Sequence, residues 1–209
     1  MYTVYGRIGT GSIAVEAVLE ETGAPFQVRD VVKDPDGRPP ADYFDIHPQG
    51  RVPAMILPDG KVMTESAAIV IHLADSHPEA RLAPPHGAPD RAAFLSAMLF
   101  LATGIYNSDL IVVYAPRYTT DAGGADGVRA AALEAMEAEW RVFERMLGGR
   151  RYILGDAFSA ADIYAAMLMT WNEDVPAFFR DHPELKAHHD RVASRPPVAR
   201  AWKRHGLEA

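Results

Sequence analysis

Two short segments in the first third of the chain hold the side chains and backbone groups with the clearest chemical potential. Gln49-Gly-Arg-Val-Pro53 leads into an apolar run, and Glu65-Ser66 stands directly before a helix-like run. A cis bond before the proline would turn the backbone N–H and C=O of Val52 outward, where they can pair with an extended peptide. The start of a helix favours a carboxylate, to which the Ser66 hydroxyl can donate, while Glu65 can hold an ammonium group. The pattern indicates a ligand with a peptide backbone, an α-carboxylate and an α-amine; a turn proline and a plain helix cap are the alternative, and both stay open.

The elements that must position these segments follow from the spacing of apolar and turn residues. Ser12 before the first helix-like run and Gly23 just past it are typical helix caps. Pro58-Asp59-Gly60 between two apolar runs predicts a hairpin. The two strands around the first helix should be parallel, with a right-handed crossover. The expected strands are Tyr2–Tyr5, Phe26–Val32, Pro53–Leu57 and Lys61–Thr64, and the expected helices are Ile13–Glu21, Asp42–Ile46 and Ala67–Asp75.

The remainder of the chain is predicted to be helical after a proline-rich linker. Apolar residues spaced three and four apart mark one face of a helix, at Leu133, Met136, Trp140, Phe143 and Leu147. Ser159-Ala-Ala-Asp162 is similar to a capping box, with Asp in place of Glu or Gln. The predicted organisation is an α/β domain of order βαβ-α-ββα at residues 1–78, a linker at 79–89 and an all-α domain at 90–209.

Composition excludes several classes of function. The 209 residues carry a net charge of −7, which argues against a nucleic-acid partner. The chain has no cysteine, which excludes disulfides, Cys-bound zinc and Cys nucleophiles. The start has no signal-peptide pattern, and the apolar stretches Ala67–Ala74 and Ala97–Ala102 are shorter than the roughly 20 residues that span a bilayer. We therefore expect a cytoplasmic protein without a membrane partner.

Three other patterns are weaker indications of a function or a structure. Gly6-Arg-Ile-Gly9-Thr-Gly11 after a strand, with Asp30 further on, makes a dinucleotide-binding fold the runner-up, but the spacing is not G-x-G-x-x-G and a hairpin interrupts the alternation. His188-His189-Asp190 suggests a metal only superficially, because adjacent helix residues point to different faces; we expect surface solvation and no metal. A solvated helix face is also expected for Arg200, Lys203 and Arg204.

Four segments, in their order along the whole chain, resemble the cytosolic glutathione transferases. They are Leu19-Glu-Glu-Thr-Gly-Ala-Pro-Phe26, His47-Pro-Gln-Gly-Arg-Val-Pro-Ala-Met55, Glu65-Ser-Ala-Ala-Ile69 and Leu154-Gly-Asp-Ala-Phe-Ser-Ala-Ala-Asp-Ile163. The second and third are fairly specific for a glutathione-binding domain. The resemblance implies a thioredoxin-like domain followed by an all-α helical domain, glutathione as co-substrate, a hydrophobic electrophile or a peroxide as second substrate, a detoxification role and a homodimer.

The resemblance also implies roles for single residues. Val52 would pair its backbone with the cysteinyl part of glutathione, and Pro53 would be the cis proline. Glu65 and Ser66 would hold the γ-glutamyl end. The polar neighbours of the glycyl end would be Arg51 and Gln49, with Arg38 as a weaker candidate.

A hydroxyl donor near the start of the first helix would stabilise the glutathione thiolate, because a hydrogen bond to the charged form favours it. Ser12 is the preferred candidate, followed by Thr10 and then Tyr5. The structural alternative is a helix cap for Ser12 and a core strand residue for Tyr5. The cysteine of the bacterial cysteine-type enzymes would fall on or next to Gly11, so this chain resembles a serine/threonine-type or unclassified member. The missing thiol argues against disulfide-exchange chemistry.

The electrophile pocket should come from the early helices of the second domain, where polar and aromatic side chains follow an apolar helix. These are Tyr106, Asn107, Tyr114, Arg117 and Tyr118. Their rings could line a pocket and their hydroxyls could donate to a developing negative charge. Packing between helices is the alternative for each tyrosine. A non-catalytic glutathione-binding module and a nucleotide-dependent oxidoreductase are the two alternative functions.

Overall fold

The computed structural model describes residues 1–207 of the chain. It separates into two compact units, each described here by itself. The first comprises Met1–Pro85 together with the residues from Asp190 onward, and the second comprises His86–His189. The predicted boundaries at 78 and 90 lie close to the first division, but the last stretch of the chain groups with the α/β unit by its contacts rather than with the helices that precede it.

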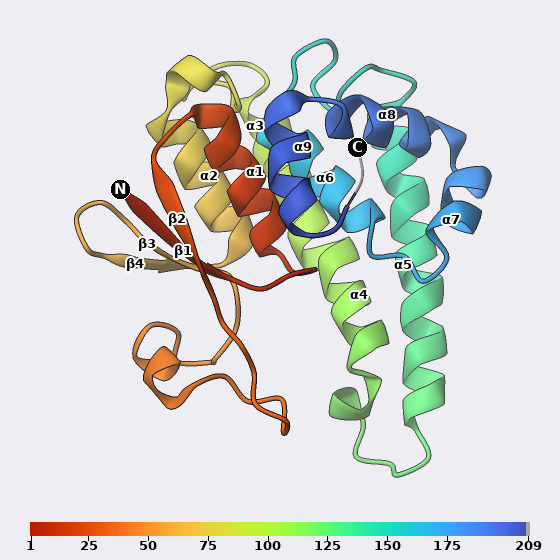
Figure 1. The fold of residues 1–209 in the computed structure, drawn as a ribbon. Helices are drawn as coiled ribbons and strands as arrows, with labels where there is room; N and C mark the ends of the chain where they lie inside the picture. The colour runs from red at the N-terminus through yellow and green to blue at the C-terminus, as the bar shows by residue number, and fades with distance from the viewer. Residues whose placement is uncertain (208–209) are drawn as a thin grey trace. The chain divides into compact units, whose positions relative to one another are not determined.

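The first unit is built on a mixed four-stranded sheet (Figure 1). Its strands are β1 (Tyr2–Gly6), β2 (Phe26–Asp30), β3 (Ala54–Ile56) and β4 (Val62–Thr64), in the order β2-β1-β3-β4. β1 pairs with β2 in parallel, whereas β1–β3 and β3–β4 are antiparallel, which confirms the predicted βαβ unit and hairpin. The antiparallel half of the sheet also shows that the dinucleotide-binding alternative was wrong.

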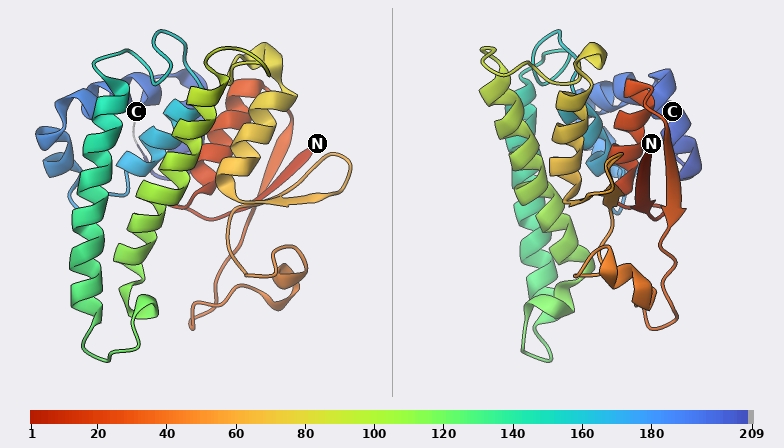
Figure 2. Two further views of the ribbon diagram at one scale, coloured as in Figure 1. Left: turned by 180° about the vertical axis from the view of Figure 1, so that it is seen from behind. Right: turned by 90° about the vertical axis from the view of Figure 1, so that its left-hand side faces the viewer.

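Helices α1 (Ser12–Thr22) and α2 (Ser66–Ser76) contact each other and cover one face of this sheet (Figure 2). Val4 of β1 and Ile13 of α1 are fully buried there. The opposite face carries a smaller apolar cluster of Val31, Tyr43 and Ala54, with the short 3₁₀ helix η1 (Ala41–Asp45) above it. Successive side chains of a strand point to opposite faces of the sheet, so Val4 of β1 points to one face and its two neighbours in the chain point to the other.

The N-terminal cap of α1 differs from the sequence prediction. Gly11 holds the N-cap position without a side-chain bond, and Ser12 is the first helical residue. The C-cap prediction is confirmed, since Gly23 has φ 68° and donates its N–H to the carbonyl of Leu19.

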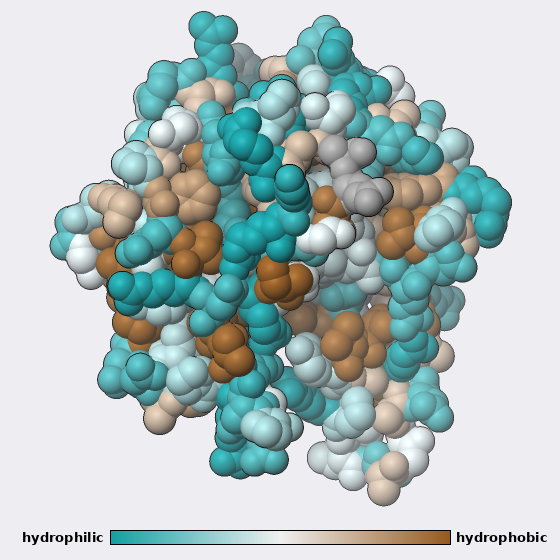
Figure 3. Space-filling model, in the orientation of Figure 1, coloured by the Kyte–Doolittle hydropathy of each residue, from teal (hydrophilic) through white to brown (hydrophobic). Residues whose placement is uncertain are grey.

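The last helix, α9 (Pro196–Arg204), packs against α1 within the first unit. Its buried side includes Trp202, which has no exposed surface. Its basic side chains face the acidic side of α1 and pair as Arg195–Glu21, Arg200–Glu20 and Arg204–Glu16. The solvated face predicted for these residues is confirmed for Arg200 and Lys203, which are exposed, and is wrong for Arg204, which is half-buried. Figure 3 shows the hydrophilic side chains gathered over these two helices.

The second unit is helical. A continuous helical stretch consists of α3 (Arg91–Phe100), a π turn (Leu101–Ile105) and α4 (Tyr106–Val113), and a 3₁₀ turn follows at Ala115–Tyr118. The later helices are α5 (Ala125–Leu147), α6 (Ala160–Met169), α7 (Val175–Asp181) and α8 (Pro183–Ala193), the last of which ends beyond this unit. All ten residues of α6 are buried, so it forms the central helix of the unit.

Two predictions for this unit are confirmed. The apolar stripe of α5 is buried at Met136, Trp140, Phe143 and Leu147. The capping box also forms, with both reciprocal bonds between Ser159 and Asp162 present at the start of α6.

Two other findings bear on the predictions. The continuous helix Arg91–Val113 has 23 residues and contains an 18-residue window with a mean hydropathy of 1.4, so within residues 1–207 one helix passes a length-and-composition test for crossing a membrane. A core helix passes the same test, so this is weak evidence. His188 and His189 are buried rather than solvated, because His188 bonds to the Asp162 carboxylate. In the described part of the chain, no group of three or more His, Cys, Asp or Glu residues could hold a metal ion.

Candidate functional site

The segment that leads into β3 is held by a buried tyrosine. The Tyr43 hydroxyl donates to the carbonyl oxygen of Arg51 at 2.6 Å. Burial, and then the neighbouring Tyr5, raise the pKa of Tyr43 to about 12, so this hydroxyl keeps its proton and remains a donor. Val52 packs against the apolar cluster that contains Tyr43, and the Val52–Pro53 bond is cis, as the sequence analysis had suggested. The backbone of Val52 is thereby fixed next to the first residue of β3.

Glu65 and Ser66 lie at the same end of the hairpin. Ala54 pairs with Thr64 in the β3–β4 ladder, so Pro53 and Glu65 flank one end of that ladder. Glu65 is the N-cap residue of α2, with φ 67° and an exposed side chain, while Ser66 is buried. A non-glycine residue in the left-handed region is uncommon and costs free energy, and such residues cluster at functional sites. The two predicted binding segments are therefore adjacent through the register of the sheet.

The other polar candidates lie in the loop that precedes β3. Gln49 and Arg51 have exposed side chains, and the Gln49 N–H donates to Nδ1 of the buried His47 at 3.2 Å. Arg38 lines an open pocket of about 570 Å³ together with Lys33 and Phe44. The sequence analysis gave no role to Tyr43 and His47, because their burial is known only from the structure.

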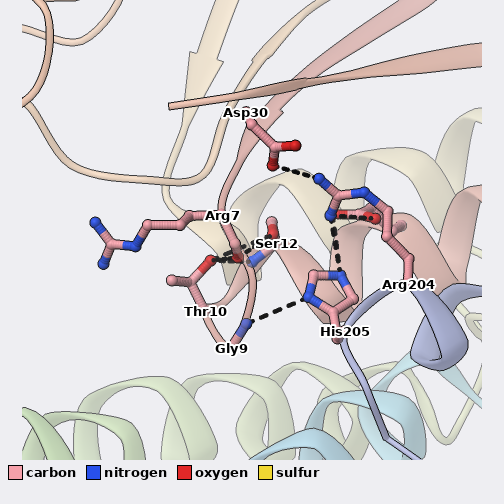
Figure 4. A network of polar contacts seen from close by, with 8 residues as sticks. Arg7, Gly9, Thr10, Ser12, Asp30, Arg204 and His205 are labelled. Atoms are coloured by element: carbon pink, nitrogen blue, oxygen red, sulfur yellow. Dashed lines mark hydrogen bonds and ion pairs between the residues drawn. The ribbon is translucent and has the colours of Figure 1, made fainter. Parts of the chain in front are cut away.

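The loop between β1 and α1 brings the two preferred hydroxyls, of Ser12 and Thr10, close together but buries them to different degrees (Figure 4). Ser12 is fully buried, and its hydroxyl donates to the carbonyl of Arg7 at 3.3 Å. It packs so closely on Gly6 that a Cβ there would lie 2.6 Å from the Ser12 oxygen. Thr10 is only half-buried, and its hydroxyl donates to the same carbonyl at 2.7 Å and lies 3.2 Å from that of Ser12. Of the two, Thr10 is the one nearer to solvent.

Tyr5 lies on the other face of the sheet from Ser12. Its ring contacts Tyr43, with 5.6 Å between ring centroids, and its hydroxyl accepts a hydrogen bond from Arg29 at 3.3 Å. Gly6, which touches Ser12, is the next residue and points to the α1 side. The structure therefore brings the hydroxyls of Thr10 and Ser12 together, whereas that of Tyr5 lies apart from them.

A second polar network behind the loop was not predicted. The Gly9 N–H donates to Nδ1 of His205 at 3.3 Å, and Nε2 of His205 lies 3.2 Å from the Glu16 carboxylate. Arg204 pairs with Glu16 and with Asp30 (Figure 4). Asp30 thus has a structural partner in place of the ribose considered above. Glu16 was visible in the sequence as a lone charge within the apolar run of the first helix, which signals a buried partner.

The predicted electrophile-pocket residues belong to α4 and the 3₁₀ turn after it. The Tyr106 ring packs edge-on against Trp171 at 4.9 Å and near-parallel to Tyr164 at 6.3 Å. The Arg117 guanidinium lies 4.1 Å from the centre of the Tyr114 ring. Asn107 and Tyr118 are exposed. Tyr106 thus packs within the helical unit, while the others lie at its surface or half-buried.

An unpredicted carboxyl group is buried beside these residues. Asp109 of α4 is 9% exposed, and burial, followed by the nearby Glu173 carboxylate, raises its pKa to about 6. Burial also raises the pKa of Glu139 on α5, against the effect of its hydrogen bond from Ser108. Asp109 is a lone charge among the apolar residues of its helix, as Glu16 is in α1, and this signal was not used in the sequence analysis.

Comparison with known proteins gives matches over nearly the whole chain. The family models described as "Glutathione S-transferase, N-terminal domain" and "Glutathione S-transferase, C-terminal domain" match residues 12–76 and 110–196. Glutathione S-transferase GstA of Escherichia coli O157:H7 is 27% identical, and the match covers 98% of this chain and 99% of that protein.

Solved structures that resemble this chain belong to the same family. A sphingomonad glutathione S-transferase complexed with glutathione is 32% identical with a TM-score of 0.83, covering 98% of this chain and 99% of the other. A glutathione transferase homolog from sulfitobacter with bound glutathione is 29% identical with a TM-score of 0.88, covering 99% of each chain. These matches confirm the predicted thioredoxin-like domain followed by a helical domain, and the chain belongs to the glutathione S-transferase family of enzymes.

Proposed function

We propose that this protein binds reduced glutathione along the Val52–Pro53 and Glu65–Ser66 segments and stabilises its thiolate for attack on a hydrophobic electrophile. The observation that carries the proposal is Glu65 at φ 67°, beside the end of the β3–β4 ladder. The Val52 backbone pairs with the cysteinyl part, and Glu65 and Ser66 hold the γ-glutamyl end. Gln49 and Arg51 are neighbours of the glycyl end. The relatives whose structures contain glutathione support this choice of co-substrate.

Thr10 is the proposed thiolate donor, ahead of the Ser12 favoured by the sequence. The Ser12 hydroxyl is fully buried and turned toward Gly6 and the Arg7 carbonyl, so its role is to stabilise the loop. Thr10 is half-buried, directly before the N-terminus of α1. There the helix dipole and a hydroxyl proton both favour a negative sulfur. Since the chain has no cysteine, the reacting thiol is that of glutathione, which can attack an electrophile or reduce a peroxide.

Thr10→Ala is expected to lower kcat with an activated aryl halide by about 10- to 100-fold, because one transition-state hydrogen-bond donor is lost. Thr10→Ser should keep most of the rate, since it retains the hydroxyl. Turnover is measured together with proton release on glutathione binding, in two buffers of different ionisation enthalpy. A larger loss in Ser12→Ala than in Thr10→Ala would return the role to Ser12.

Glu65→Gln is expected to raise the Kd for glutathione about 10-fold, because the amide keeps the shape but loses the charge that holds the ammonium group. Calorimetric titration measures the change. Glu79→Gln is the control, since Glu79 is an exposed acid of the same unit that pairs only with His77 in the described contacts. An equal Kd in Glu65→Gln and wild type would place the γ-glutamyl end elsewhere.

The remaining expectations belong to the same proposal: a cytoplasmic homodimer with a role in detoxification, and an electrophile held by the segment from Tyr106 to Tyr118. The specific alternative is a glutathione-binding module without turnover, which the burial of Ser12 favours. Glutathione binding without proton release, and no turnover with any aryl halide, would establish that alternative.

A further inference from the structure

We infer that His205, the C-cap residue of α9, is a positioning residue for the loop that carries Thr10. The inference rests on the proposed function of Thr10 for its catalytic part. The structural part rests on one contact, in which the Gly9 N–H donates to Nδ1 of His205 at 3.3 Å across 196 positions of the chain (Figure 4).

The contact defines the protonation state of the imidazole. A backbone N–H can only donate, so Nδ1 of His205 must be the unprotonated acceptor. The single ring proton then sits on Nε2, which faces the Glu16 carboxylate at 3.2 Å. Nε2 also lies 3.5 Å from Nη1 of Arg204, another donor group, and Arg204 is directed instead to Glu16. A neutral imidazole therefore satisfies both of its neighbours at once.

Burial and the contact with Glu16 hold the His205 imidazole in place. His205 and Glu16 are 6% and 2% exposed, and Glu16 also accepts from Arg204 at 3.2 Å. Arg204 reaches Asp30 at the end of β2 as well, so the final helix is joined to both α1 and the sheet. A side chain with so little freedom holds the Gly9 amide in one place.

The held amide lies one residue before the proposed donor. Gly9 has φ 70° and is exposed, with no heavy atom near the position of a Cβ, so sterics alone do not fix its backbone. Thr10 has its own bond to the Arg7 carbonyl, within the same loop. The bond from Gly9 to His205 is thus the contact that ties this loop to a different part of the unit, and through it the final helix sets where the Thr10 hydroxyl points.

Two substitutions at one position separate the two ring nitrogens. In His205→Asn the amide oxygen stands where Nδ1 was and can accept from Gly9. In His205→Gln the amide nitrogen stands where Nε2 was and can donate to Glu16, but the acceptor for Gly9 is lost. Arg200→Gln is the matched control, because it removes a pair between the same two helices, with Glu20, away from the loop.

The first readout is hydrogen exchange of the Gly9 amide in the ligand-free full-length protein. We expect exchange about 5- to 10-fold faster in His205→Gln, and near wild-type rates in His205→Asn and Arg200→Gln. Unchanged protection in His205→Gln would overturn the inference whatever the chemistry. If His205→Gln does not fold, loss of Gly9 protection in His205→Ala, with unchanged protection in Arg200→Gln, makes the same test.

The second readout is the split between kcat and KM with glutathione and an activated aryl halide. We expect kcat to fall about 5- to 10-fold in His205→Gln with KM for glutathione little changed, and His205→Asn to recover the rate. An unchanged kcat in His205→Gln, while Thr10→Ala is impaired, would overturn the positioning role. Faster Gly9 exchange in His205→Gln together with a fully active Thr10→Ala would support the anchor and overturn the proposed function of Thr10 instead.

Discussion

Replacement of Asp162 by alanine is expected to lower the free energy of unfolding by about 3–5 kcal/mol. The Asp162 carboxylate is completely buried at the start of α6. Its Oδ1 accepts from the Ile153 N–H and contacts Nε2 of His188, both at 2.9 Å, and its Oδ2 accepts from the N–H and hydroxyl of Ser159. Alanine would leave all of these partners buried without an acceptor, and each such group carries its own desolvation cost.

Urea unfolding followed by circular dichroism measures this effect. Asp174→Ala is the matched control, because Asp174 caps α7 by accepting from the Ala177 N–H at 2.9 Å but is exposed. An exposed cap of this kind is worth about 1 kcal/mol. Equal losses in the two variants would show that the buried network adds nothing beyond ordinary capping.

Asp109→Asn is expected to increase stability at neutral pH, by up to about 3 kcal/mol more than it does at pH 4. The ordinary pKa of this carboxyl is 3.8, and burial followed by the Glu173 charge raises it to about 6. The folded state therefore binds the proton more tightly than the unfolded state. The stability contributed by the protonated Asp109 is full below pH 3.8 and is lost as pH rises through about 6. Asparagine mimics the neutral acid at every pH, so its advantage grows as pH rises from 3.8 to about 6 and is complete above that range.

The measurement is the difference in unfolding free energy between Asp109→Asn and wild type, at several pH values from 4 to 8. Asp126→Asn serves as the control, because Asp126 is an exposed acid in the first turn of α5. A benefit of Asp109→Asn that is the same at pH 4 and pH 8 would mean that the Asp109 carboxyl ionises no differently in the folded and unfolded states.

The local patterns of the first unit were sufficient to predict its architecture. Gly23 ends α1, and the Pro58-Asp59-Gly60 turn reverses the chain between β3 and β4, because both depend on backbone conformations that only neighbouring residues control. The same holds for the box at Ser159 and Asp162, which spans three residues. The two segments proposed to bind glutathione were also singled out from the sequence, since each follows or precedes a recognisable strand or helix.

Side-chain direction within the loop before α1 was not predictable in this way. Ser12 and Thr10 are two positions apart and chemically alike, yet one is sealed against Gly6 and the other is half-exposed. The difference depends on how closely α1 approaches β1, which no spacing rule reports. Helix α9 shows the same limit, since Arg204 was expected on a solvated face but is half-buried and pairs with Glu16 of α1.

The sequence by itself therefore determined the order of elements, the family and the segments expected to hold glutathione, because these depend on short-range backbone preferences and on motifs read along the chain. Only the tertiary structure decided which hydroxyl is accessible, that Asp109 is buried, and that His205 reaches Gly9. Those outcomes depend on contacts between residues far apart in the chain. Such residues become buried and meet their charged partners only after the helices have packed.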